Sequence, residues 1–315
     1  MIKDVQIIVG ATESEQRLDR WLVARFPAVA RAQAEEAAAA GTVLVNGRRA
    51  AKGSALAAGD VVQILQCLEK SDFAAIPDAT LPLDIVFADE HLLACNKPAG
   101  MPVHPQRAGE TGTLVNALLG RHPELAGLGG DAMFPAFAHR IDTETSGLVL
   151  AARTPSVYDA LRTLFRTRKI HKEYLALVHG RVGKGERLDD ELAHDPAQPE
   201  RMIILTNRNR ATARKPMRAM TEFSVAEHLG KFTLLRVVIE TGVTHQIRCQ
   251  LAARGYAVVG DKIYGAPGAD TLGLARHFLH AARLEFVHPV TAAPLKLEAP
   301  LPPELTAILA QLRHA

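Results

Sequence analysis

The sequence predicts an α+β protein in which a small domain precedes a large one, and three observations lead to this prediction. The first 70 residues place two helical patterns before short strand patterns, as one self-contained unit. A polar stretch containing Pro77 and Pro82 then interrupts the pattern, as a linker does. Beyond it, short apolar strand patterns alternate with helical ones. We therefore expect a small module at residues 1–68, a linker at 69–82 and a large domain at 83–315.

Composition limits the class of protein. With 315 residues, 48% hydrophobic and 23% charged, the chain has the make-up of a soluble globular protein with a sizeable core. A net charge of +3 does not by itself identify a nucleic-acid binder. Cys67, Cys95 and Cys249 are too few and too widely spaced for a disulfide framework. No signal peptide or membrane-spanning run is evident, so we expect a cytoplasmic monomer with no membrane partner.

The small module reads as two helices followed by a hairpin. Apolar residues recur at helical spacing over 16–26, and a second helix over 31–40 meets Gly41, a favourable residue just past a helix end. The segment 42–48 contains the Asn-Gly pair typical of tight hairpin turns. A further turn and strand are expected over 59–65.

The large domain shows short strands, helices and one rigid loop. Residues 96–105 are rich in Pro and Gly, which predicts the loop. Thr244 is the expected N-cap of a helix that Gly255 closes. The other expected elements are strands at 85–87, 92–95, 148–152, 172–178 and 233–240, a helix at 113–119 ended by Gly120, and a helix that starts at Thr154-Pro155.

The stretch from His139 to Leu150 is the most distinctive part of the chain. Arg140 and Asp142 place opposite charges beside small hydroxyl residues, directly before an apolar strand pattern. An isolated Arg-x-Asp pair is usually a solvated ion pair of little energetic weight. Charged groups that adjoin a buried strand also fit a site held by a rigid element.

Five ordered motifs resemble the signatures of the RluA-type pseudouridine synthases, over about residues 80 to 305. The first 70 residues are similar to the alpha-L RNA-binding module of certain ribosomal proteins. The resemblance implies that the large domain is built on a mixed, mostly antiparallel sheet flanked by helices, with a cleft across its middle. The motifs are Asn96-Lys97-Pro98-Ala99-Gly100, the His139–Leu150 stretch, Lys172-Glu173-Tyr174-Leu175-Ala176, Thr241 to Arg248, and Gly260 to Gly265 followed by Leu279 to Pro289.

Two positions depart from the family pattern. Val243 stands where an Arg is customary, so a phosphate or loop contact is missing there. The module's second helix, residues 31–40, carries one cation against two anions, which predicts weak RNA binding because phosphate affinity grows with the number of cations. Cations on other elements could compensate for this, namely Arg17, Arg20, Arg25, Arg48, Arg49 and Lys52.

The resemblance also implies the chemistry. Pseudouridine formation breaks the bond between ribose C1′ and uracil N1 and rejoins the base through C5, without redox change and therefore without a cofactor. Asp142 corresponds to the nucleophile, and attack at C1′ or at C6 of the base is left open. Arg248 would supply the opposing cation as a bidentate pair with that carboxylate. Tyr174 would stack on the flipped-out base, near the C5 proton that leaves.

Further residues are expected to contact RNA. Residues 201–218 hold six Lys or Arg and no acidic residue. Within them, Arg208-Asn209-Arg210 and Arg214-Lys215 predict a basic loop between strands that meets phosphate. The basic end of the helix after Pro155 fits either the helix dipole or an RNA-facing patch. Expected substrate contacts are Arg140, Ile247, His245, Gln246 and Thr145, and expected backbone contacts are Arg208, Arg210, Arg214, Lys215, Arg166 and Arg168.

Other functions are less well supported. Asp142 and Glu144 resemble a glycosidase carboxylate pair, but nothing else in the chain supports that reaction. Ser146 lacks the preceding Gly of a hydrolase nucleophile elbow. His245 and Cys249 have metal-ligand spacing without further ligands in register, so no metal is expected. A non-catalytic RNA-binding protein is the main alternative to a synthase. Large-subunit ribosomal RNA is the expected target, with transfer RNA as the alternative.

Overall fold

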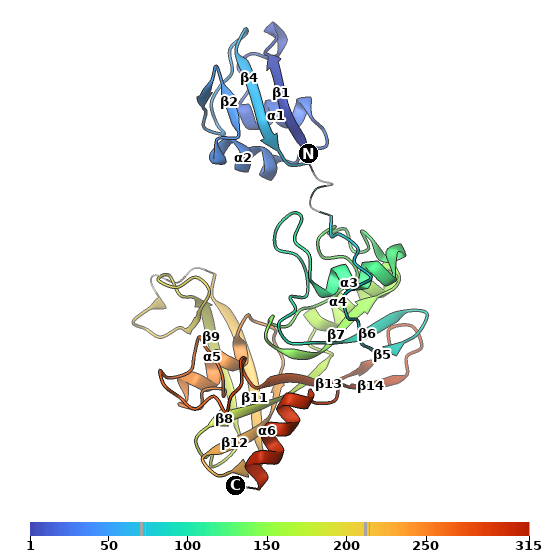
Figure 1. Ribbon diagram of the computed structural model, residues 1–315, viewed down its shortest axis with the longest axis vertical. Coiled ribbons are helices and arrows are strands. Elements are labelled where there is room, and N and C mark those ends of the chain that lie inside the picture. Colours follow the sequence, from blue (N-terminus) through green and yellow to red (C-terminus); the bar gives the residue numbers. More distant parts are fainter. Residues whose placement is uncertain (70–71, 73, 211–212, 214, 315) are drawn as a thin grey trace. The chain divides into compact units, whose positions relative to one another are not determined.

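The structure is a computed structural model that describes residues 1–69, 72, 74–210, 213 and 215–314. The chain divides into two compact units (Figure 1). One comprises Met1–Ile76 and Pro105–Thr111, and the other comprises Pro77–His104 and Gly112–Ala315. Within the described ranges, no helix is long and apolar enough to cross a membrane.

The first unit is a four-stranded antiparallel sheet packed on two helices. The expected hairpin turn is present, because Asn46 and Gly47 have φ of 53° and 74°, as a primed turn requires. Small buried residues of the second helix allow it to approach a core that includes Trp21 and Ile64. The sheet order is β1-β4-β2-β3, with β1 Ile2–Ile8, β2 Val43–Val45, β3 Arg48–Arg49 and β4 Val61–Cys67, and the helices are α1 Leu18–Arg25 and α2 Arg31–Ala40.

The second unit is built on a ten-stranded mixed sheet flanked by helices, which confirms the predicted fold class. The order is β10-β9-β11-β12-β8-β13-β7-β6-β5, and β14 pairs with β13. The strands are β5 Ile85–Ala88, β6 Leu92–Lys97, β7 Ser146–Ala152, β8 His171–His179, β9 Glu186–His194, β10 Met202–Ile204, β11 Met217–Leu229, β12 Phe232–Ile239, β13 Leu279–Val287 and β14 Pro294–Glu298. The helices are α3 Leu114–Arg121, α4 Pro155–Arg166, α5 Gln246–Ala253 and α6 Pro303–Arg313.

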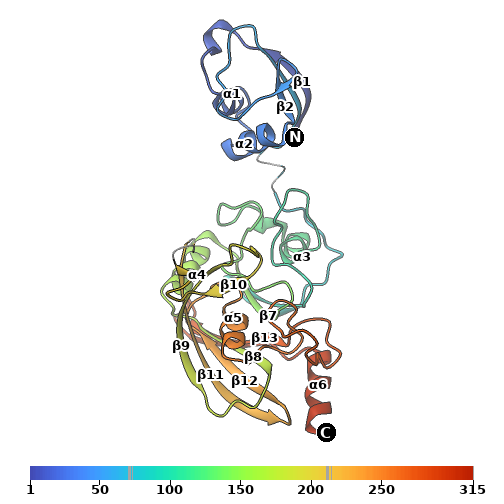
Figure 2. The ribbon, with the colours of Figure 1, turned by 90° about the vertical axis from the view of Figure 1, so that its left-hand side faces the viewer.

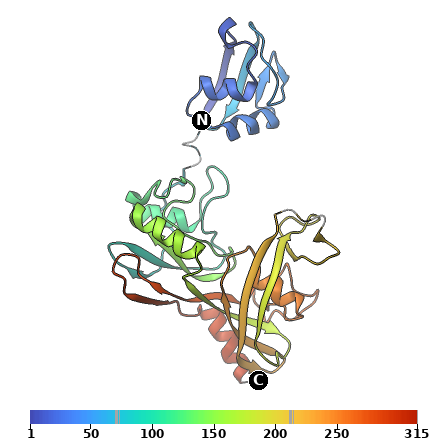
Figure 3. The ribbon, with the colours of Figure 1, turned by 180° about the vertical axis from the view of Figure 1, so that it is seen from behind.

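Two helices cover different parts of this sheet (Figures 2 and 3). All seven residues of β7 are buried, and α4 packs its apolar face, including Val157 and Leu161, against this strand. Helix α5 lies against β9, β10 and β11, where Cys249 contacts a small apolar cluster. Strand β7, which follows the turn of Asp142, is thus fixed by core packing in one part of the unit, and α5 by packing in another.

Two local predictions were wrong. Gly120 does not end its helix but lies inside α3, which runs to Arg121. A glycine suits this position because an added Cβ would stand 2.3 Å from the backbone nitrogen of Ala79. Thr244 is not the N-cap of α5, since His245 takes that place in the left-handed region, with φ of 54°. The basic loop expected around Arg208 and Lys215 does lie between strands, since β10 ends at Ile204 and β11 begins at Met217.

A short seam joins the two halves of the ten-stranded sheet. Strands β7 and β13 run parallel and share two registered pairs, His280 with Ser146 and Ala281 with Gly147. Side chains reinforce the seam: the Ser146 hydroxyl lies 2.9 Å from Nδ1 of His280, and Nη2 of Arg276 donates to the same oxygen at 3.2 Å. Such buried polar groups hold one register because each has a partner.

Thr145 adds a further hydrogen bond at the seam, with 2.8 Å between its Oγ1 and Nε2 of His277. Burial lowers the pKa of His277 to about 3, with the nearby Arg248 cation acting in the same direction. His277 is therefore neutral in the folded protein at ordinary pH.

Gly147→Ala should destabilise the second unit by about 2 to 4 kcal/mol. Gly147 has φ of 113°, and an added Cβ would lie 2.2 Å from the carbonyl oxygen of Ala281 across the seam. Urea unfolding measures the loss. Gly183→Ala is the control, since nothing lies within 4 Å of its Cβ position, and it should change stability by less than about 0.5 kcal/mol. Equal stability of the two variants would contradict the close approach.

The buried neutral state of His277 predicts a pH dependence of stability. Below about pH 6.5, the ordinary histidine pKa, the unfolded chain binds a proton at His277 that the folded chain does not bind. The stability that this difference provides is therefore fully present above about pH 6.5 and is lost as pH falls toward 3. His277→Gln should flatten the slope of unfolding free energy against pH by up to about 1.4 kcal/mol per pH unit. Urea titrations at pH 7.5, 6 and 5 test this, with the exposed His314→Gln as a control that leaves the slope unchanged.

Candidate active site

A cavity of about 110 Å³ opens beside the seam in the second unit. Its walls come from the turn before β7, from β8, from the turn into α5 and from the first residue of β13. All eight residues that the sequence assigned to catalysis or substrate binding line this cavity: Arg140, Asp142, Thr145, Tyr174, His245, Gln246, Ile247 and Arg248.

Asp142 lies in the tight turn that leads into β7. The N–H of Thr145 donates to the backbone carbonyl of Asp142 at 3.0 Å, which closes the turn. Its side chain is one-fifth exposed, and Oδ2 accepts a hydrogen bond of 2.9 Å from Nη1 of Arg248. Nε2 of His245 lies 3.8 Å from the same oxygen.

Arg248 does not make the bidentate pair with Asp142 that the sequence predicted. Its Nε and Nη2 donate instead to the two oxygens of Asp261, at 2.7 and 2.9 Å, and a single nitrogen remains for Asp142. The guanidinium is 5% exposed. Burial opposes its charge, but the hydrogen bonds with Asp261 and Asp142 raise the pKa of Arg248 above its ordinary value.

Asp261 was not singled out from the sequence. It lies in the Gly260–Gly265 motif, where its side chain is fully buried and its Oδ1 also accepts from the N–H groups of Ile263 and Tyr264. Burial alone would raise the pKa of Asp261, but the hydrogen bonds from Arg248 outweigh it and hold that pKa below its ordinary value. The signal that could have found it is an acidic residue in a glycine-bounded turn shortly after an arginine that needs a partner.

Tyr174 lies on β8 and is 8% exposed at the cavity wall. Burial raises the pKa of its phenol, and the negative charge of Asp142 raises it further. The phenol is therefore protonated at neutral pH, and its ring offers a flat apolar surface for a base.

His245 is held in a strained backbone conformation by its neighbours. Its Nδ1 lies 3.2 Å from the hydroxyl of Tyr264, and the ring stands edge-on to that tyrosine. Burial lowers the pKa of His245, although Asp142 opposes this. The left-handed conformation of His245, with φ of 54°, is uncommon for a residue other than glycine.

Cys249, four residues after His245, has a partner inside the protein. Its thiol donates to the carbonyl of Met202, and burial raises its pKa to about 11. In the described part of the chain, no group of three or more His, Cys, Asp or Glu side chains could hold a metal ion.

The other predicted substrate contacts differ in exposure. Gln246 is buried, and its amide makes four hydrogen bonds inside the protein, two as acceptor and two as donor. Thr145 is also buried and bonded to His277. Ile247 is buried at the wall, whereas Arg140 is exposed at the rim. Gln246 and Thr145 therefore hold the cavity walls in place, and Arg140 is accessible to an incoming RNA.

Lys97 supports the turn of Asp142 from inside the protein. Its fully buried ammonium donates to three carbonyl oxygens, those of Pro98, Met101 and Thr143, at 2.7 to 2.9 Å. Burial lowers the pKa of Lys97 to about 7, and the nearby carboxylates of Asp142 and Glu144 oppose the shift. The sequence marked this residue within a motif without assigning it a contact.

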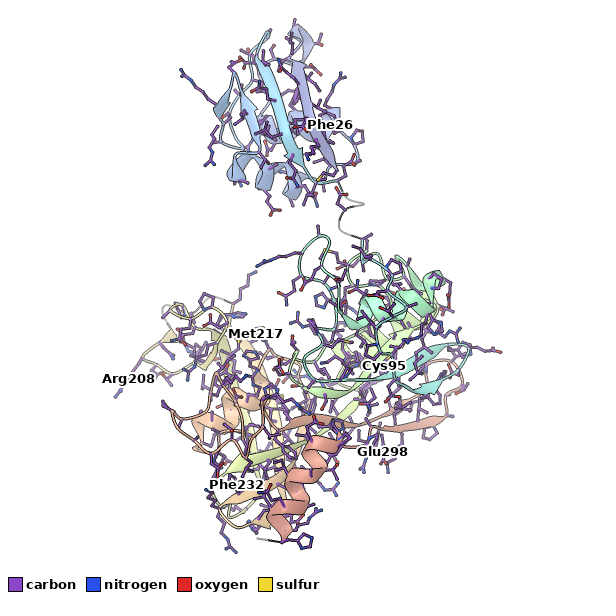
Figure 4. All side chains as sticks on the ribbon, viewed as in Figure 1. Phe26, Cys95, Arg208, Met217, Phe232 and Glu298 are labelled. Carbon is purple, nitrogen blue, oxygen red and sulfur yellow. The ribbon has the colours of Figure 1, made fainter. Side chains whose placement is uncertain are left out.

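Five of the six predicted RNA-backbone residues are described by the structure, and none of the five lines the cavity. Arg208 extends outward between β10 and β11 (Figure 4), and Lys215 is exposed in the same segment. Arg210 pairs with Glu191, and Arg168 lies 3.9 Å from Glu240. Arg166 is exposed at the end of α4, and Arg214 lies outside the described residues.

Protein carboxylates meet part of the basic run. Arg218 donates to Asp189 at 2.8 Å, and Arg210 is paired with Glu191, both of β9. These two cations are therefore neutralised within the protein and need no external anion. Arg208 and Lys215 have no carboxylate partner among the described residues.

Comparison with known proteins agrees with this geometry. The profile of the RNA pseudouridylate synthase family matches residues 91–253, and that of the S4 domain matches residues 16–62. The ribosomal large subunit pseudouridine synthase D of Xanthomonas campestris pv. campestris is 34% identical over 98% of this chain and 92% of its own length. An RNA pseudouridine synthase of Chloroflexus aurantiacus is 38% identical over 98% of this chain and 93% of its own.

A solved structure shares the fold. The human RNA pseudouridylate synthase domain containing 1 superposes with a TM-score of 0.59 and 24% identity, over 76% of this chain and 98% of that one. The family match spans the turn of Asp142, strand β8 and helix α5, the elements that meet at the cavity. The chain therefore belongs to the RNA pseudouridylate synthase family and is an isomerase with an S4 RNA-binding domain.

Proposed function

We propose that this enzyme converts uridine to pseudouridine in large-subunit ribosomal RNA, with Asp142 as the nucleophile. The observation that carries the proposal is the meeting of Asp142, Tyr174 and Arg248 at one cavity from segments far apart in the sequence. RNA binding alone needs neither a buried ion pair nor a carboxylate aimed into a cavity. The named relative that acts on the large ribosomal subunit supports the choice of RNA.

The contacts of Asp142 support its role. Among the described residues, Arg248 and His245 both approach Oδ2 of Asp142, which leaves Oδ1 as the oxygen for attack. Attack at C1′ expels the base directly, and attack at C6 first opens the pyrimidine double bond. Both routes end with loss of the C5 proton and gain of a proton at N1, so the reaction is a balanced isomerisation.

The wall residues suit a flipped-out uridine. Tyr174 and Ile247 provide apolar surfaces for the base, and His245 faces it with a neutral imidazole. Arg140 at the rim would meet the displaced strand or a phosphate. Phosphates further along the RNA would meet Arg208, Lys215 and Arg166, with Arg210, Arg168 and Arg214 as additional contacts.

For the domain organisation, we keep the division into a module at 1–68, a linker at 69–82 and a catalytic domain at 83–315. The module should bind RNA weakly, because the one cation of α2, Arg31, already pairs with Glu35 at 3.1 Å and Asp19 at 3.3 Å. Arg17 and Lys52, two of the expected compensating cations, are paired with Asp19 and Glu35 in the same way. Such a chain is expected to work in the cytoplasm, where bacteria assemble their ribosomes.

Asp142→Asn should abolish turnover while RNA binding is retained. Removing a covalent nucleophile should lower the rate by at least about 10³-fold. Tritium release from C5-labelled uridine in ribosomal and transfer RNA measures turnover, and filter binding measures affinity. Release by Asp142→Asn at the wild-type rate would remove Asp142 from this role, and release from transfer RNA alone would replace the proposed target.

Tyr174 should act chiefly through its ring in binding. Tyr174→Phe keeps the stacking surface and should leave KM within about 3-fold, whereas Tyr174→Leu should raise KM about 10-fold, since base stacking contributes about 1 to 3 kcal/mol. Steady-state kinetics on a labelled RNA fragment compare the two variants. A KM that rises equally in both would show that the hydroxyl, and not the ring, holds the base.

A further inference from the structure

We propose that Asp261 is a positioning residue. It forms the bidentate pair with Arg248 and so leaves one oxygen of Asp142 free to react. This inference rests on the proposed role of Asp142 as the nucleophile. It concerns a residue outside the family profile match, which ends at residue 253.

The guanidinium of Arg248 divides its N–H donors unequally between Asp261 and Asp142. An arginine presents a fork of two N–H donors that favours bidentate pairing with a carboxylate. Arg248 uses the fork formed by Nε and Nη2 on Asp261, with bonds of 2.7 and 2.9 Å. Asp142 receives one bond of 2.9 Å, from Nη1 to Oδ2. A bidentate pair with Asp142 would instead engage both of its oxygens and hinder attack.

The carboxylate of Asp261 is held in a fixed orientation by its own turn. Its Oδ1 accepts hydrogen bonds from the N–H groups of Ile263 and Tyr264, at 2.9 and 3.0 Å, so the carboxylate cannot rotate away from the arginine. The turn that carries it is tight, because a Cβ on Gly260 would stand 2.2 Å from the carbonyl oxygen of Arg276. The turn is also tied to β8, since the N–H of Val259 donates to the carbonyl of Leu177 at 2.9 Å.

The net charge of the three ion-paired side chains also favours a reactive Asp142. Two carboxylates share one guanidinium, so the group of Asp142, Arg248 and Asp261 carries a net charge of −1. The arginine can therefore stabilise Asp142 without neutralising it fully. A carboxylate with a net negative environment stays a better nucleophile than one in a closed, neutral pair.

The test compares Asp261→Asn with Asp261→Glu under single-turnover conditions. Asp261→Asn frees the fork to turn toward Asp142, so the rate of the chemical step should fall about 10- to 100-fold, the range seen when a supporting partner is lost. The Kd for RNA should stay within about 3-fold, because Asp261 lies behind the arginine rather than at the cavity wall. The acidic limb of the pH–rate profile should move to lower pH, since the neutral amide of Asp261→Asn no longer shares the charge of Arg248.

Asp261→Glu separates charge from geometry. It keeps the negative charge and misplaces the carboxylate, so the rate should fall while the acidic limb stays in place. Asp190→Asn is the matched control, because Asp190 pairs with Arg254 and Gln250 near the same helix but does not line the cavity. It should leave the rate and the pH profile within about 2-fold of wild type.

The outcomes separate the possible failures. If Asp261→Asn behaves like Asp190→Asn, or loses only RNA affinity, the positioning role is wrong. Each rate is normalised to the folded fraction from urea unfolding, so a loss that disappears on normalisation also overturns it. If Asp261→Asn does not fold, Asp261→Glu decides through its rate and pH profile. Full activity of Asp142→Asn would instead overturn the nucleophile itself, which is a distinct result.

Discussion

The guanidinium of Arg248 is the interaction on which the second unit depends, because it joins three separate segments of the chain. It ties the turn before β7, helix α5 and the Gly260–Gly265 turn together through Asp142 and Asp261. A charge buried to this extent is stable only when its donors are paired, and loss of one partner typically costs about 3 to 5 kcal/mol. The contacts that hold the fold at this point are therefore the same contacts that would position Asp142 in the proposed reaction.

The position of the cavity follows from the way the sheet is joined. A continuous antiparallel sheet has its strand faces filled by side chains, which leaves little room for a substrate. Here β7 and β13 share only two registered pairs, and the chain turns away beside them. Asp142 comes from the β7 side of this seam, and Tyr174 comes from β8 on the other side. The polar contacts of Ser146 and Thr145 with two histidines stabilise the seam where backbone pairing is sparse.

Local sequence patterns predicted the turns and helix starts that backbone preferences determine. The Asn46-Gly47 turn and the proline at the start of α4 set their elements through backbone preferences alone. The family motifs identified Asp142, Tyr174 and Arg248 by resemblance. The resemblance did not identify Asp261 as the second partner of Arg248. Its place in a glycine-bounded turn is a signal, but the chain holds many carboxylates and the folded turn shows which one the arginine reaches. The same holds for Thr244, where helix propensity favoured a capping hydroxyl but tertiary contacts of His245 with Tyr264 set the helix start. Strands such as β1 and β9 depend on partners far along the chain, so their pairing carries no local signal.

Charge pairing limits how much of the RNA affinity can come from electrostatics. The net charge is only +3, and several exposed cations already have carboxylate partners inside the protein, including Arg210 and Arg218 in the catalytic unit and Arg31 in the small one. A paired cation must break its ion pair before it can displace a counterion from RNA, so it contributes less to affinity and to its salt dependence. Arg208, Lys215 and Arg166 have no such partner among the described residues and would contribute fully. Under the proposed function, recognition would rely largely on the shape of the RNA around the target uridine.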